Sequence, residues 1–187
     1  MPHCPREDIS RFLQRVDFIR KGFLLRMVEL IHADSVEWTD KVRNIFEHYA
    51  GSLPFDLAFQ GFAEELANLP GEYRPPTGCL LLAVQRQEVI GCVALRKIGE
   101  GICEMKRLFV VPEWRGKGVG VILAKALIRE AGRIGYERMR LDTVPSMISA
   151  LALYRSLGFK EIASYCLNPI PGAKFFELNL KLKKIGK

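Results

Sequence analysis

The chain has 187 residues, of which 49% are apolar and 26% charged, so it is neither disordered nor fibrous and suits a single domain with a buried core. Its net charge is +7, and much of the positive charge lies near the two ends, so we expect solvated termini and no nucleic-acid partner. It has no apolar run of about 18 residues and no signal segment, so we expect a cytoplasmic protein that makes no membrane contact. The scattered cysteines and histidines lack metal-ligand spacing, which predicts reduced thiols and no metal.

Hydrophobic periodicity predicts an amphipathic helix followed by a mixed series of strands and helices. The helix, at residues 8–19, belongs to a predicted N-terminal extension at residues 1–26, and the core domain is expected at residues 27–187. The expected strands are residues 27–33, 79–85, 89–98, 102–111, 137–143, 159–167 and 174–182. The expected helices are residues 38–49, 57–69, 119–134 and 146–157. This order predicts a single α+β domain, with a mixed sheet covered by helices.

A glycine-rich turn joins a strand to a helix between Leu108 and Gly120, where the chain reads L-F-V-V-P-E-W-R-G-K-G-V-G. Glycines let the backbone approach an anion closely, and the first N–H groups of a helix have no intrahelical partner. The helix dipole adds positive charge there, and Arg115 and Lys117 add more. The turn therefore predicts a phosphate site, although its spacing fits neither the dinucleotide fingerprint nor the P-loop.

A second motif at residues 150–159 reads A-L-A-L-Y-R-S-L-G-F. Together the two motifs resemble the GNAT superfamily of acyl-CoA-dependent N-acyltransferases. In that family the pyrophosphate loop is R-G-x-G-x-G after a strand L-x-V-x-P, and the later signature is A-x-x-x-Y-x-x-x-G-F. The resemblance covers residues 27–182 and is strongest between Glu104 and Phe159. It implies a GNAT-type fold with a mixed, largely antiparallel sheet flanked by helices, and acetyl-CoA as the donor.

The resemblance also implies roles for residues of both motifs. The CoA pyrophosphate would bind the loop residues Arg115, Gly116, Lys117, Gly118, Val119 and Gly120. The pantetheine arm would bind the strand residues Leu108, Phe109 and Val110, in a strand expected to bulge, to splay from its neighbour and to polarise the acyl carbonyl through N–H groups near Leu108. Tyr154 matches the tyrosine that protonates the departing thiolate, and Met147 stands where the family often has a cofactor-binding asparagine.

The acceptor amine, with a pKa near 10.4 for a lysine-like group, must lose a proton before or during attack. Glu104 matches a catalytic glutamate of some relatives, and we predict that it is the general base, directly or through water. The alternative is a cross-strand salt bridge with Arg96 or Lys106. Cys103 adjoins Glu104, but strand alternation points the two side chains to opposite faces, so no acyl-enzyme is expected.

Arg140 and Asp142 lie two residues apart on one predicted strand, so they share a face. They are candidates for binding the acceptor, with a structural ion pair as the alternative. Tyr165, Asn168 and Lys174 flank the final hairpin, which often borders the acceptor site in relatives.

The sequence thus predicts an N-acetyltransferase that moves an acetyl group from acetyl-CoA to a primary amine by direct attack in a ternary complex. We expect a small-molecule acceptor rather than a protein. A non-catalytic acyl-CoA-binding or sensor module is the alternative, and it would not need Glu104 or Tyr154. Both a monomer and a homodimer remain open.

Overall fold

The computed structural model describes residues 27–181, and the predicted helix at residues 8–19 lies outside that range. One seven-stranded sheet has the order β1-β2-β3-β4-β5-β7-β6. Its strands are β1 (Glu29–His32), β2 (Cys79–Gln85), β3 (Glu88–Gly99), β4 (Ile102–Val110), β5 (Arg138–Thr143), β6 (Lys160–Ile162) and β7 (Lys174–Asn179). The α-helices are α2 (Thr39–Gly51), α3 (Phe62–Ala67), α4 (Val119–Ile134) and α5 (Ile148–Ser156). Neighbouring strands of this sheet are antiparallel except β4 and β5, which confirms the predicted mixed, largely antiparallel α+β fold.

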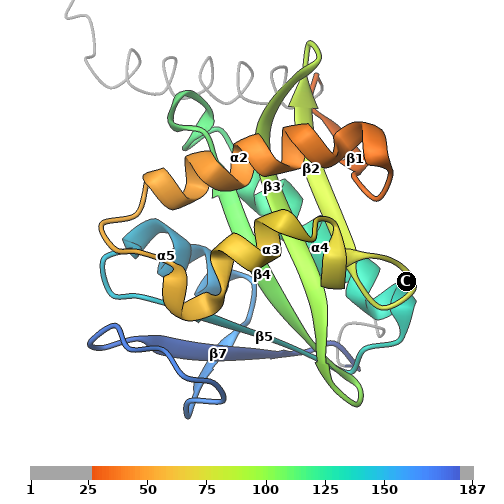
Figure 1. Cartoon of the computed structure of the whole chain (residues 1–187). Coiled ribbons are helices and arrows are strands. Elements are labelled where there is room, and N and C mark those ends of the chain that lie inside the picture. The colour runs from red at the N-terminus through yellow and green to blue at the C-terminus, as the bar shows by residue number, and fades with distance from the viewer. Residues whose placement is uncertain (1–26, 182–187) are drawn as a thin grey trace, which may run out of the picture.

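Helices cover both faces of the sheet, with α2 and α3 on one face and α4 on the other (Figure 1). The α4 face buries one large core, to which Leu123 and Leu127 contribute from the helix. The opposite face buries a second core around Val42, Ile45 and Phe46 of α2. Within residues 27–181, no helix combines the length and the apolar character needed to cross a bilayer.

Helix α4 has the predicted limits because a glycine stands at each end. Gly118 precedes it with φ 92° and Gly135 follows it with φ 107°, both in the left-handed region that a Cβ disfavours. The apolar residues between them recur at helical spacing and face the sheet. The glycine-rich turn is therefore held at the amino end of a well-packed helix.

The helix predicted at residues 57–69 is interrupted. The chain forms a 3-10 turn at Ala58–Gln60 and then α3 at Phe62–Ala67. Gly61 lies between them with φ 68°, a left-handed conformation that ends the first turn before the second begins. The short segment that results crosses the sheet close to the carboxyl half of β4.

The strand predicted at residues 159–167 is too long, since β6 ends at Ile162. Beyond it, the Tyr165 hydroxyl donates a hydrogen bond to Glu104 on β4. Pro169 and Pro171 follow, and neither has an N–H group for a sheet ladder. The segment 163–173 therefore leaves the sheet and crosses its α3 face, where it supplies side chains to the site.

Candidate active site

The strands β4 and β5 separate part-way along their length. Their parallel pairing joins only Ile102–Glu104 to Arg138–Arg140, although β4 continues to Val110 and β5 to Thr143. Two cavities occupy the region beyond the last pair, and both are lined by Leu108. The predicted splay of these strands is therefore present.

A β-bulge in β4 lies beside this opening. Cys92 pairs with Phe109 and Ala94 with Lys106, so one residue of β3 faces two residues of β4. In the bulge, Arg107 has a φ of 57°, and the Cys92 thiol donates a hydrogen bond to the Arg107 carbonyl at 3.1 Å. The bulge turns this peptide out of the ladder and re-aims the backbone around Leu108 toward the cleft.

The outer cavity is a groove of about 630 Å³ between the end of β4 and the start of α5. Among the residues predicted to bind the cofactor, five line it directly: Leu108, Phe109, Val110, Arg115 and Gly120. Residues 146–150 form the facing wall, with Met147 at the N-cap of α5. This groove has the position expected for a ligand that ends at the bulge.

The predicted phosphate loop borders the groove through Arg115 and Gly120. Gly116 and Gly118 have φ values of 72° and 92°, and no side chain caps the first N–H groups of α4. The Arg115 Nε donates to the Val110 carbonyl at 3.0 Å, and Lys117 lies over the Trp114 ring. Val119 differs from its neighbours in the loop, because its side chain is buried in the core. The turn thus combines open backbone donors with two cations, which suits a phosphate.

The inner cavity has a volume of about 40 Å³ and lies deeper in the cleft. Tyr154 of α5 lines it, with its ring packed at 5.8 Å from Phe159 and 6.4 Å from Phe176. Burial is the main cause that raises the pKa of Tyr154 well above its usual value, followed by the electrostatic effects of Tyr49 and then Asp142. The phenol therefore keeps its proton at neutral pH, as a proton donor must.

Glu104 is buried on the α3 face, and both of its carboxylate oxygens have partners. Oε2 accepts from the Arg96 Nε at 2.8 Å, and Oε1 accepts from the Tyr165 hydroxyl at 2.7 Å. The cross-strand salt bridge considered for Glu104 is thus formed with Arg96, which also pairs with Glu72. Burial and the charge of Glu104 raise the pKa of Tyr165 far above its usual value. Glu104 and Tyr165 therefore form one hydrogen-bonded unit on the α3 face, outside the lining of both cavities.

Arg140 and Asp142 share the α3 face, as predicted, but have different partners. Arg140 pairs with Glu177 of β7 at 2.8 Å. Asp142 lines the inner cavity, accepts a hydrogen bond from Asn168 at 2.7 Å and lies 3.6 Å from the Lys106 ammonium. Asp142 thus lines the cleft, whereas the Arg140 guanidinium forms an ion pair with a residue of the neighbouring strand β7.

Two of the three candidate residues around the final hairpin form hydrogen bonds to the carboxylates described above. Tyr165 bonds Glu104 and Asn168 bonds Asp142, but Lys174 pairs with Glu161. Cys103 points to the opposite face from Glu104, into the α4 core, as strand alternation predicts.

One component of the site escaped the sequence analysis. Arg107 is 2% exposed at its side chain, and its guanidinium makes a forked hydrogen bond to Glu65 of α3. A further bond joins it to Gln60, and the ring of Phe62 lies 5.1 Å from it. A charged residue inside a predicted strand is the only sequence signal, because its partners are about 40 residues away in the chain. These contacts hold α3 and Gln60 against β4, and Gln60 lines the inner cavity.

The fold and this cleft define an acyl-CoA-dependent acyltransferase. The chain matches the model of the acetyltransferase (GNAT) family over residues 38–159, well over half of its length. An uncharacterised N-acetyltransferase of Schizosaccharomyces pombe is 40% identical over 143 residues, which cover 75% of this chain and 88% of that protein. The chain belongs to the GNAT family and is an N-acetyltransferase.

Other relatives and structures agree with this assignment. Human N-acetylaspartate synthetase is 31% identical over 110 residues, or 58% of this chain and 36% of that protein. A GNAT acetyltransferase structure from Staphylococcus aureus matches with a TM-score of 0.68 at 20% identity, over 82% of this chain and 99% of that one. A Salmonella typhimurium acetyltransferase solved with acetyl-CoA matches with a TM-score of 0.60 at 20% identity, over 82% and 94%. At these identities the two structures support the fold.

The Arg107–Glu65 pair predicts a particular dependence of stability on pH. Burial alone raises the pKa of Glu65, but the hydrogen bonds and charge of Arg107 outweigh it and hold the pKa below its ordinary value. Such a carboxylate stabilises the fold above its unfolded pKa of about 4.3, and the contribution is lost as the pH falls through the folded pKa. Glu65→Gln should therefore cost about 3–5 kcal/mol at pH 7, and this deficit should shrink as the pH falls below about 4.

Urea denaturation of both proteins across this pH range measures the deficit. Asp40→Asn is the matched control, because Asp40 pairs with Arg43 at the surface, with side-chain exposures of 89% and 37%. That substitution should change the free energy of unfolding by less than about 1 kcal/mol. A Glu65→Gln deficit that stays constant from neutral to acid pH contradicts the ionised pair.

Proposed function

We propose that this N-acetyltransferase transfers the acetyl group of acetyl-CoA to the primary amine of a small molecule while both are bound. The main support is that the outer groove and the inner cavity share Tyr49, Leu108 and Met147 in their walls. A donor lying in the groove would therefore present its thioester at the bulge, next to an amine in the inner cavity. Direct attack needs this proximity and no covalent enzyme intermediate.

The size of the inner cavity supports a small acceptor. Its volume of about 40 Å³ suits an amino group and its first carbon atoms, and Leu57, Phe59 and Gln60 cover it. The relatives named N-acetylaspartate synthetases carry the name of a small N-acetylated amino acid. An extended peptide would have to displace the segment that Arg107 fastens in place.

The residues of the cleft fit the donor and divide the proton transfers between two faces. When bound, acetyl-CoA supplies an activated thioester to the site. The turn at Gly116 and Gly118 would hold its pyrophosphate through the open N–H groups of α4, and the backbone near Leu108 would polarise the acyl carbonyl. Tyr154 would give its proton to sulfur as the C–S bond breaks.

Glu104 is the proposed acceptor of the proton that the amine loses as the new C–N bond forms. It lines neither cavity, so the proton would have to reach it through a water molecule or through the Tyr165 hydroxyl, which lies 2.7 Å from it. Asp142 is the second candidate, because its carboxylate lies in the wall of the inner cavity itself. The ion pair with Arg96 opposes protonation of Glu104, because a protonated Glu104 loses that charge interaction.

An acceptor screen tests the function as a whole. With acetyl-CoA, we expect free thiol to be released on addition of small amines or amino acids, with kinetics that require both substrates together. Gly118→Asp should abolish this release by placing a charge against the pyrophosphate, and each lost charge-assisted hydrogen bond alone weakens binding by about tenfold or more.

Gly132→Asp is the matched control, because a Cβ there meets nothing within 4 Å and φ is not left-handed. It should retain both CoA affinity in calorimetry and thiol release. Release only with peptides would contradict the small-molecule acceptor. Equal CoA affinity for Gly118→Asp and wild type would contradict the placement of the pyrophosphate.

Tyr154→Phe tests the proton donor. The ring packs in the core, so the variant should fold and bind acetyl-CoA almost as wild type does, while turnover falls by about 10²–10⁴-fold. Tyr136→Phe is the control, because its hydroxyl bonds the Thr77 carbonyl away from the cleft. Single-turnover rates isolate the chemical step. An unchanged rate for Tyr154→Phe returns this tyrosine to a packing role.

Glu104→Gln and Asp142→Asn distinguish the two candidate bases. The variant that lacks the base should continue to gain rate with pH where wild type has levelled off. Without the base, only amine that is already deprotonated in solution can react, and its fraction rises with pH. We expect this of Glu104→Gln, with Asp142→Asn parallel to wild type. The reverse result assigns the proton to Asp142. Profiles parallel for both variants, with a stability loss in Glu104→Gln, leave Glu104 as a salt-bridge residue only.

A further inference from the structure

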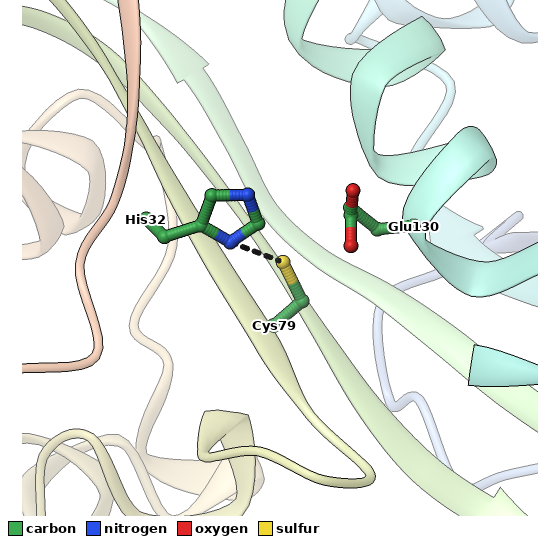
Figure 2. A group of neighbouring side chains, drawn as sticks. All are labelled: His32, Cys79 and Glu130. Carbon is green, nitrogen blue, oxygen red and sulfur yellow. Dashed lines mark hydrogen bonds between the residues drawn. The ribbon is translucent and has the colours of Figure 1, made fainter. Parts of the chain in front are cut away.

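Three metal-ligating side chains from distant parts of the sequence converge away from the cleft. His32 ends β1, Cys79 begins β2, and Glu130 lies on α4. One ligand atom from each lies within 4.8 Å of the other two, and the His32 Nδ1 is 3.8 Å from the Cys79 Sγ. Figure 2 shows the Glu130 carboxylate facing the imidazole and the thiol across a gap. None of the three lines either cavity of the active site.

We propose that His32, Cys79 and Glu130 bind a zinc ion. Thiolate, imidazole and carboxylate are the ligands that zinc takes in proteins, whereas calcium and magnesium prefer oxygen alone. Bond lengths of about 2.3 Å to sulfur and 2.0–2.1 Å to nitrogen place these two ligands about 3.5 Å apart around a tetrahedral ion. The observed 3.8 Å thus needs only a small contraction.

The surroundings supply room and a route of entry for the ion. The three side chains line a cavity of about 310 Å³, together with Asp34 and Arg133. His32 is exposed and Glu130 is 20% exposed, so solvent reaches the site even though Cys79 is buried. Three protein ligands leave a fourth position, which Asp34 or water would fill.

Two contacts among these side chains can be explained without a metal, but neither explains why all three ligands lie together. Cys79 and His32 can form a weak hydrogen bond, and Glu130 pairs with Arg133 at 2.8 Å. Arg133 is 74% exposed, so that ion pair contributes little, and it occupies only Oε2 of the carboxylate. A divalent cation would engage all three ligand atoms at once, which none of these pairwise contacts does.

The proposed ion would stabilise the fold without taking part in acetyl transfer. It would join β1, an edge strand of four residues, to the carboxyl half of α4. Glu130 follows Val119 by 11 residues, about 16 Å along the helix, so the ion would lie far from the phosphate loop. The prediction that no metal is bound rests only on spacing along the chain. Spacing does not reveal that residues 32, 79 and 130 meet in space.

The experiment titrates zinc chloride into the full, tag-free chain after removal of metals with a chelator. We expect saturable binding of one ion per chain and a rise in Tm of about 5–10 °C when zinc exceeds its Kd by about 100-fold. Glu130→Gln keeps the size and helical position of a partly exposed residue, so it should fold and weaken binding at least tenfold. Cys79→Ser and His32→Gln should do the same. Acetyl-CoA affinity should not change with zinc, so the result is independent of the proposed function.

Control variants exclude other thiols and imidazoles as the source of binding. His3 and Cys4 are adjacent in the sequence, and Cys166 is an exposed thiol, so the double variant His3→Gln/Cys4→Ser and the single variant Cys166→Ser should bind zinc like wild type. Zinc binding that is lost in these controls, or retained at full strength in Glu130→Gln and His32→Gln, overturns the proposal. So does the lack of any saturable binding to wild type.

Discussion

The buried arginine at the bulge of β4 is the constraint on which the cleft depends. Arg107 has a left-handed backbone, and its charged head lies between the rings of Tyr49 and Phe62. Removing a guanidinium from water costs several kcal/mol, and a forked bond to one carboxylate offsets that cost better than a single contact does. Because the carboxylate belongs to Glu65 of α3, the same bonds that neutralise the charge hold the helix over the strand. The bulge, the cover of the inner cavity and the opening beside β5 are thus coupled.

This coupling produces a cleft that passes between the two faces of the sheet. Tyr154 enters it from the α4 side, where it belongs to the larger core. Asp142 enters from the α3 side, with the Glu104–Tyr165 unit beneath the same face. Attack on a thioester brings the nucleophile and expels the thiolate from different directions, so this separation suits the proposed acid and base. A flat, fully paired sheet would bury these groups on separate faces with no passage between them.

The sequence predicts the parts of this arrangement that depend on local patterns. The strand β2 and the helix α4 have their expected limits, because an apolar run and a pair of glycines determine them. The glycine-rich turn before α4 follows from the glycines themselves. Contacts between residues far apart in the sequence are harder to predict. Arg107 and Glu65, and likewise Tyr165 and Glu104, are brought together only by the tertiary fold. The early end of β6 has the same cause, since a side-chain contact outside the sheet replaces the ladder.

The distribution of charge separates the two halves of the cleft. On the α3 face each of the charged side chains Glu104, Lys106, Arg107, Asp142 and Glu177 has an opposite charge within 4.0 Å. At the loop, within residues 27–181, no ion pair engages Arg115 or Lys117, which contact a carbonyl and aromatic rings instead. The positive potential is therefore available where phosphates would lie and cancelled where the amine would lie. A cationic amine would gain little from such a cavity, which is consistent with the proposed attack by the neutral form.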